Sequence, residues 1–175
     1  MRKRLCFILA ILLLALGAFC GCGAEKGSFC GFGEPFVADV EGEWNGVRFS
    51  AEICGGEKGE NGVLPLTVTF YAPEALCGTS LCRTAAGEVQ LSSGALSLPV
   101  KASFSPLFDL FAADTVNGAV TLLDGGMTAV DAAGVRYLLL PDDTLFRIEA
   151  ENGFLNVKSL RFASAETAFT DALSD

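Results

Sequence analysis

Carboxylates are the most numerous side chains in this sequence that could carry out chemistry. They gather in three groups: Asp39, Glu41 and Glu43; Asp142 and Asp143; Glu149 and Glu151. Two carboxyl groups facing each other can hydrolyse a glycosidic bond, one as acid and the other as nucleophile or base. Here the members alternate along predicted strands or fall in a turn, which places them toward solvent. We therefore interpret all three groups as solvated surface.

The usual partners of catalytic carboxylates and hydroxyls are missing from the sequence. The 175 residues include no histidine, which removes the commonest general base and the commonest metal ligand. Ser80 and Ser105 consequently have no partner base, and the run Asp124-Gly125-Gly126 lacks the regular oxygen spacing of a calcium loop. The sequence predicts neither an enzyme nor a metal or cofactor site.

The N-terminus carries the clearest signal of the chain. Three cations, Arg2-Lys3-Arg4, precede an uncharged apolar run from Leu5 to Phe19, and small residues and cysteines follow. This order is typical of a secretory signal. The apolar run is shorter than the roughly 20 residues that span a bilayer, so a permanent transmembrane anchor is disfavoured.

The end of this segment resembles a bacterial lipobox, in which a cysteine after a small residue receives diacylglycerol before the signal is removed. Cys22 follows Gly21 and fits this pattern, whereas the rival Cys20 follows the bulky Phe19. The resemblance implies a signal peptide at residues 1–21 and an acylated, palmitate-bearing Cys22 on the extracytoplasmic face of the cell membrane. Two or three acyl chains hold a protein stably on a membrane. An ordinary cleaved signal with incidental cysteines is the alternative.

The remaining cysteines could form disulfides in an exported domain. Once Cys6 and Cys20 leave with the signal and Cys22 is acylated, four of the seven remain: Cys30, Cys54, Cys77 and Cys82. An even number in an oxidising compartment suggests two disulfides, and we favour the local pairings Cys30–Cys54 and Cys77–Cys82. Four free thiols are the alternative, and no C-x-x-C spacing supports a zinc site.

The charge of the mature chain limits its partners. Removal of residues 1–21 takes away three of the 12 cations and none of the 21 acids, which leaves a net charge near −12. Such a surface repels nucleic acid, so we exclude nucleic-acid binding. Residues 22–34 are rich in glycine and are interpreted as a tether, and residues 35–175 are expected to form a single β-rich domain.

The elements of that domain are short strands at meander spacing. Apolar and polar residues alternate over 36–44 and 47–54, on either side of Asn45-Gly46, the strongest short hairpin signal. Further runs at 64–71, 80–84, 88–91, 96–101, 119–123, 127–131, 135–140, 144–150 and 154–162 bring the tally to about ten strands. The convincing helix lies at 105–113, with Ser105 as N-cap and Pro106 in the first helical position. A second helix is possible over 163–175.

The sequence therefore predicts a mainly β fold with one or two helices. A large antiparallel sheet must curl to protect its apolar face, and a half-barrel with the helix on its concave side satisfies this need. The order of elements resembles the lipoprotein-carrier (LolA/LolB-like) superfamily, as found in small lipoproteins of Gram-positive bacteria. The segments that carry the resemblance are Pro35–Val40, Leu66–Phe70 with Pro73–Gly78, Leu98-Pro99 with the helix, and Leu139–Asp142.

In that superfamily the concave face accepts lipid acyl chains, and the resemblance implies a lining for this chain. The implied residues are Phe36, Ala38, Val40, Trp44, Val47, Phe49, Ile53, Leu66, Val68 and Phe70, with Leu107, Phe108, Leu110 and Phe111 from the helix. We therefore expect a membrane-anchored, non-enzymatic lipoprotein that binds a lipid or hydrophobic ligand. The alternative is a structural or interaction domain in which the same residues fill a core and an acidic face meets an envelope protein.

Overall fold

The structure is a computed structural model that describes Phe29, residues 31–100 and residues 105–163. The predicted signal peptide, Cys20, Cys22, Cys30 and the predicted helix beyond Ala163 lie outside the described residues. Among the described residues no helix is both long enough and apolar enough to cross a membrane.

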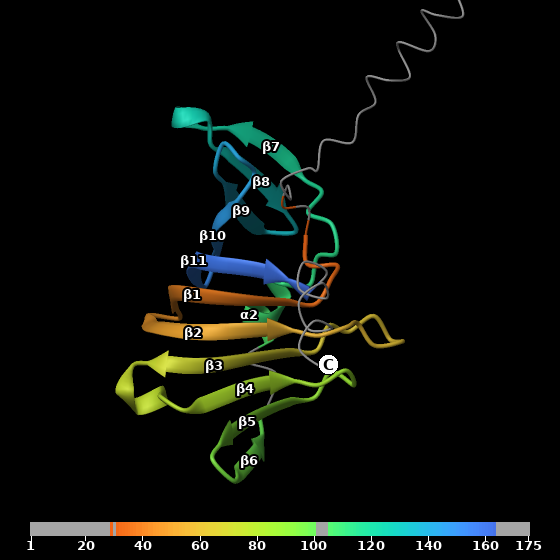
Figure 1. Cartoon of the computed structure of the whole chain (residues 1–175), viewed down its shortest axis with the longest axis vertical. Coiled ribbons are helices and arrows are strands. Elements are labelled where there is room, and N and C mark those ends of the chain that lie inside the picture. The colour runs from red at the N-terminus through yellow and green to blue at the C-terminus, as the bar shows by residue number, and fades with distance from the viewer. Residues whose placement is uncertain (1–28, 30, 101–104, 164–175) are drawn as a thin grey trace, which may run out of the picture.

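Within the described residues, eleven antiparallel strands form one sheet, and each corresponds to one of the eleven runs of the predicted meander (Figure 1). The strands are β1 (Phe36–Trp44), β2 (Val47–Gly55), β3 (Leu66–Ala72), β4 (Thr79–Arg83), β5 (Val89–Ser93), β6 (Leu96–Pro99), β7 (Ala119–Leu122), β8 (Thr128–Ala132), β9 (Val135–Leu139), β10 (Leu145–Ala150) and β11 (Gly153–Phe162). Their order in space is β6-β5-β4-β3-β2-β1-β11-β10-β9-β8-β7.

In this strand order, the two halves of the chain meet in the middle of the sheet, where β1 pairs with β11. Short helical turns, η1 (Glu74–Leu76) and η3 (Asp124–Gly126), follow β3 and β7. The predicted turn between β1 and β2 is confirmed: Asn45 and Gly46 both have positive φ, 50° and 78°, as a two-residue hairpin loop of this kind requires. Both outer strands, β6 and β7, are left as sheet edges.

The helix α2 (Ser105–Asp109) is shorter than the predicted 105–113. After Asp109 the backbone tightens, because the N–H groups of Phe111 and Ala112 donate to carbonyls only three residues back. Leu107, Phe108, Leu110 and Phe111 are nevertheless all buried. The tight turn therefore keeps the apolar stripe against the sheet after the α-helix has ended.

The helix lies against the concave face of the sheet, and the core fills the space between them. The residues of β1, β2 and β3 that alternate inward, such as Ala38, Ile53 and Val68, are almost fully buried, and the intervening residues face outward. The predicted fold class, a curved antiparallel sheet with a helix on its concave side, is confirmed.

Candidate functional site

The apolar residues that the sequence assigns to a ligand lining form a packed centre. Thirteen of the fourteen are buried. Ring centroids lie 5.8 Å apart between Phe36 and Phe111 and 5.5 Å apart between Phe49 and Phe70, which are ordinary aromatic packing distances. Val47 is the exception, with 49% of its surface exposed, because it lies at the hairpin end of β2. The centre of the concave face is therefore occupied by α2 rather than hollow.

The sequence did not identify two further aromatic residues that belong to this core. Phe29 and Phe32 are buried, and the ring of Phe32 packs 4.9 Å from Phe36 and 5.0 Å from Phe111. They lie in the glycine-rich stretch that the sequence assigns to a tether. Their presence in the core shortens the segment that could act as a tether to residues 22–28. Two phenylalanines three residues apart were the available signal.

Two polar side chains hold the α2 segment to the sheet from opposite sides. The Tyr137 hydroxyl on β9 donates to the Leu110 carbonyl at 2.9 Å, and burial raises the pKa of Tyr137 to about 12. On β4, Arg83 Nη1 lies 3.4 Å from Asp109 Oδ1, and the guanidinium sits 5.1 Å from the centroid of the Phe108 ring. Burial lowers the pKa of Arg83, and Asp109 partly offsets this. The guanidinium stays protonated at any physiological pH.

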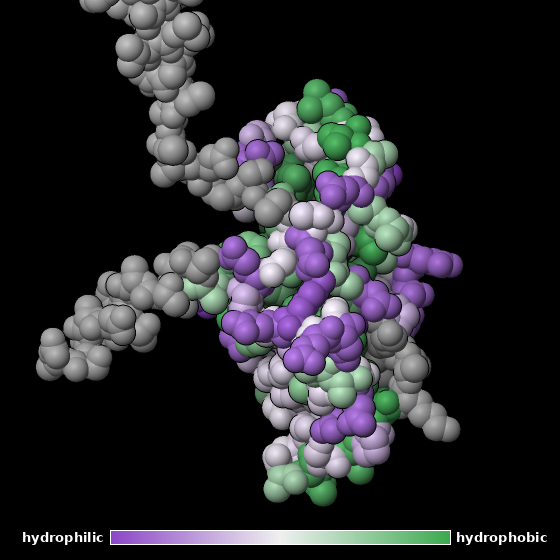
Figure 2. Space-filling model, turned by 90° about the vertical axis from the view of Figure 1, so that its right-hand side faces the viewer, coloured by the Kyte–Doolittle hydropathy of each residue, from purple (hydrophilic) through white to green (hydrophobic). Residues whose placement is uncertain are grey.

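The apolar concave face continues beyond the part that α2 covers. Across β4, β5 and β6, Leu81 pairs with Leu91 and Leu91 with Leu98, so all three side chains are on one face. Leu81 is fully buried, whereas Leu98 is 60% exposed. At the other end of the sheet, Val120 on β7 is in register with Val130 and Tyr137 and is 69% exposed. Apolar surface gathers at both ends of the molecule, with a polar middle (Figure 2).

An open hollow of about 390 Å³ lies at the β4–β6 end. Its wall consists of Arg83, Gly87, Glu88, Val89, Gln90, Pro99 and Val100. Val89 is in register with Arg83 and lies two residues before Leu91 on the same face of β5. The hollow therefore adjoins the exposed leucines, and the buried guanidinium of Arg83 forms part of its wall. This arrangement could hold an apolar chain with an anionic end.

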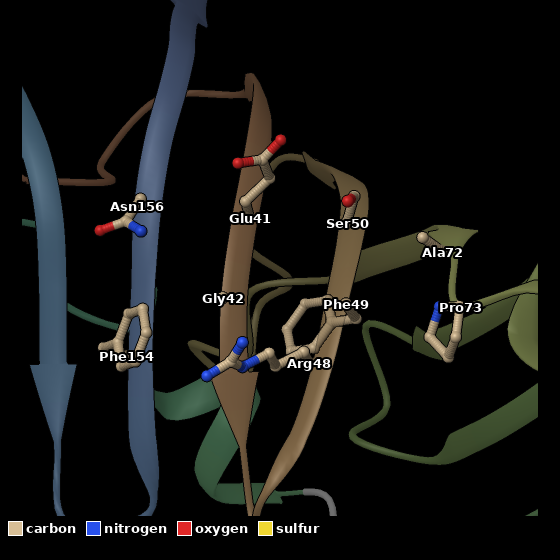
Figure 3. A pocket seen from close by; sticks show the side chains of 9 residues that line it. All are labelled: Glu41, Gly42, Arg48, Phe49, Ser50, Ala72, Pro73, Phe154 and Asn156. Carbon is tan, nitrogen blue, oxygen red and sulfur yellow. The ribbon is translucent and has the colours of Figure 1, made fainter.

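A second open hollow of about 400 Å³ lies across β11, β1 and β2 (Figure 3). Asn156, Glu41 and Ser50 lie in a row across the three strands, with Phe154, Arg48 and Phe49 beside them and Pro73 at the far wall. The charged and amide groups already have partners: Glu41 binds Lys158 at 2.8 Å, Arg48 binds Glu43 and Asn156 accepts from Arg147. The Arg48 side chain is 88% exposed and those of Glu41 and Lys158 are 55% exposed, which favours a solvated surface over a ligand site.

Members of the three carboxylate groups have ordinary surface partners in the fold. Asp39 accepts a hydrogen bond from Ser159 at 2.7 Å, and Glu149 pairs with Arg147. Asp142 Oδ1 accepts from the Thr144 backbone, which is ordinary turn chemistry. The described residues include no group of three or more His, Cys, Asp or Glu side chains placed to hold a metal ion.

Cys54, Cys77 and Cys82 are free thiols in the structure, so the favoured Cys77–Cys82 disulfide is not formed there. The register explains this: Cys54 and Cys82 flank Thr67 on either side of β3, while Cys77 lies in the turn before β4. Burial, together with the neighbouring Glu52, raises the pKa of Cys54.

Comparisons with known proteins give likenesses of structure alone. No protein-family model matches the sequence, and no curated protein matches it. Three solved structures are similar. An uncharacterised conserved protein from Thermus thermophilus has a TM-score of 0.42 and 16% identity, over 74% of this chain and 79% of that one.

A DUF1329 family protein from Desulfovibrio piger has a TM-score of 0.42 and 12% identity, over 80% of this chain and 88% of that one. A proposed outer membrane lipoprotein-sorting protein domain from Vibrio parahaemolyticus has a TM-score of 0.40 and 10% identity, over 79% of this chain and 87% of that one. At these TM-scores, none of the three structures shows the family or the activity of this chain.

Proposed function

We propose that this chain is a lipid-anchored, non-enzymatic binding domain of the bacterial envelope that takes an acyl chain with an anionic head at the β4–β6 end. One observation carries the ligand part. The apolar row that is fully buried at Leu81 continues uncovered through Leu91 to Leu98, beside a hollow whose wall contains Arg83.

The chemistry of the two parts of this site is complementary. An acyl chain laid over Leu91 and Leu98 would remove apolar surface from water, at roughly 25 cal/mol per Å². A guanidinium suits a carboxylate or phosphate because it is a charged group with several N–H donors. Arg83 donates through Nε to the Leu64 carbonyl at 3.1 Å and faces Asp109 through Nη1. These contacts fix the guanidinium in the wall of the hollow.

The ligand is tested by native mass spectrometry of the protein taken from its own membranes. We expect a bound lipid that leaves on denaturation, unlike the covalent acyl groups of the anchor. Leu98→Arg should abolish this adduct, whereas Leu122→Arg, the matched change at the other end of the sheet, should retain it. Arg83→Met should lower the share of anionic lipids among the bound adducts. An adduct that survives Leu98→Arg places the ligand elsewhere, and a parent protein without any adduct refutes binding.

The anchor is supported by the N-terminal sequence and has its own test. Cys22→Ser should release the protein from the membrane fraction, whereas Cys20→Ser should leave it attached. The opposite pattern would move the acylation to Cys20, and attachment in both variants would refute a cysteine-linked anchor at either position.

A second function, an interaction domain without a ligand, is favoured by the filled centre of the concave face. Phe32, Phe108, Phe111 and Ile148 are fully buried there. On this hypothesis the exposed leucines of β6 meet an envelope protein. Absence of any lipid adduct, together with a partner cross-linked through β6 in the parent but not in Leu98→Arg, would establish it.

A further inference from the structure

The β7 edge is an uncharged strand with an exposed apolar face. Its four residues, Ala119 to Leu122, include no charge and no proline. Val120 and Leu122 alternate onto the concave side and are 69% and 78% exposed. Natural edge strands are usually protected by charges, prolines or covering segments. An unprotected apolar edge therefore calls for a surface that covers it.

The chain enters the fold next to this edge. The Phe29 N–H donates to the Asp143 carbonyl at 3.2 Å, and its ring centroid lies 6.1 Å from that of Tyr137. Tyr137 on β9 is two strands from Val120 on β7, about 10 Å at the usual strand spacing. Gly31 packs directly against the backbone of Asp114, in the segment that leads into β7. Phe29, Gly31 and β7 thus belong to one end of the sheet.

Covalent geometry then limits how far this end can lie from an anchored Cys22. Seven residue steps separate Cys22 from Phe29 and can span at most about 25 Å. The opposite edge, β6, is eight strand steps from β9, about 38 Å along the sheet. The short connection therefore allows the β7 end to reach the membrane, while the β6 end can point away from it.

We propose that the β7 edge, through Val120 and Leu122, rests in the surface of the bilayer that carries the lipid on Cys22. This inference depends on the anchor in the proposed function but not on the ligand. It assigns the two apolar ends different partners: the β7 end meets the anchoring membrane, and the β4–β6 site stays accessible to a ligand from outside.

The charge around the edge determines which lipids favour the contact. Asp124 follows β7 directly in η3, and Asp131, which is paired with Arg136, lies on the other face of β8. Asp124, the carboxylate beside the patch, is repelled by an anionic surface. The contact should therefore be stronger on zwitterionic phosphatidylcholine than on phosphatidylglycerol, and added salt should reduce the difference.

The test is depth-dependent quenching of tryptophan in the full lipoprotein, reconstituted through its own anchor into phosphatidylcholine vesicles that contain brominated lipid. Leu122→Trp reports on the edge. Tyr71→Trp is the matched control, since Tyr71 is 52% exposed on β3. The buried Trp44 gives a constant background, which is measured in the parent. We expect bromine near the head groups to quench Leu122→Trp at least about twofold more than Tyr71→Trp.

Flotation of the vesicles separates the two ways in which the inference can fail. If the parent protein floats and both variants are quenched alike, the β7 contact is overturned and the anchor stands. If the parent protein does not float, the anchor and the contact are both overturned. Should Leu122→Trp perturb the strand, Val120→Trp provides the same readout from the same face.

Discussion

The two ends of the sheet expose similar apolar side chains but differ in what lies beside them. At the β7 end, Val120 and Leu122 adjoin the point where the chain enters the fold, and Phe29 packs on Tyr137. At the β6 end, Leu98 precedes Pro99, which lines an open hollow with a buried guanidinium in its wall. Exposed apolar side chains alone do not identify a partner. The residues beside them distinguish the two ends: the N-terminal segment enters the fold near β7, and the buried Arg83 lies near β6.

The largest effect is expected in the N-terminal segment around Phe32, which distinguishes the β7 end from the β6 end. Phe32→Ala should lower the free energy of unfolding by about 3–5 kcal/mol, because it removes a fully buried ring. Chemical denaturation measures this. Leu98→Ala, at the exposed β6 end, is the control and should change stability by less than about 0.5 kcal/mol. A loss below about 1 kcal/mol for Phe32→Ala would mean that Phe32 is not part of the core and would weaken the link between the N-terminal segment and β7.

The second test concerns how closely this segment approaches the chain leading into β7. Gly31 has φ of +146°, and a Cβ there would overlap the Asp114 carbonyl. Gly31→Ala should therefore cost about 1–3 kcal/mol and shift the segment away from Asp114. Gly46→Ala is the control, since Gly46 also has positive φ but open space around it. Equal losses would show that backbone strain alone, and not the contact with Asp114, sets the cost.

The third test compares how each end holds α2. Tyr137→Phe removes a buried hydrogen bond to Leu110 and should cost about 1 kcal/mol at pH 7. The pKa of Tyr137 is raised in the folded state, so its contribution is complete below the pKa near 10 of the unfolded chain. The contribution is lost as the pH rises through about 12.

Denaturation curves at pH 7 and above pH 10 check this. The parent should lose stability more steeply than Tyr137→Phe over that alkaline range. Arg83, which holds α2 from the other side, is present in both proteins, so the difference between the two slopes reports on Tyr137 alone. Parallel pH profiles of parent and Tyr137→Phe would mean that the hydroxyl is not buried as described.

Strand alternation in the sequence predicted most of the fold. The faces of Ala38, Ile53 and Val68 follow from period two, and Asn45-Gly46 fixes the hairpin that sets their register. Alternation assigns a side chain to a face but not to a position across the sheet. Leu98 and Leu66 show the same pattern, yet only Leu66 is buried, because α2 and its neighbours cover the middle of the sheet and not the end.

The site was harder to predict than the fold, because strand alternation does not show which residues the rest of the chain covers. Phe29 and Phe32 lie among glycines without strand alternation, so the spacing of the two rings was the single sequence signal that they belong to the core. Nothing in the sequence distinguishes Arg83 from the other cations on strands. It is buried because Phe108 and Asp109, from the α2 segment, pack against it in the folded chain.

The smallest expected effect concerns the two exposed ends themselves. Leu98→Ser and Leu122→Ser should each change the free energy of unfolding by less than about 0.5 kcal/mol, since both side chains are already largely in water. Denaturation of the purified protein in the absence of lipid measures this. A loss above about 1 kcal/mol at either position would mean that part of this chain covers that end, which leaves no free surface there for a ligand or a bilayer. Suppose instead that stability is unchanged at both ends. The two roles are then separate if the lipid adduct disappears only in Leu98→Ser and insertion of the edge into the bilayer disappears only in Leu122→Ser.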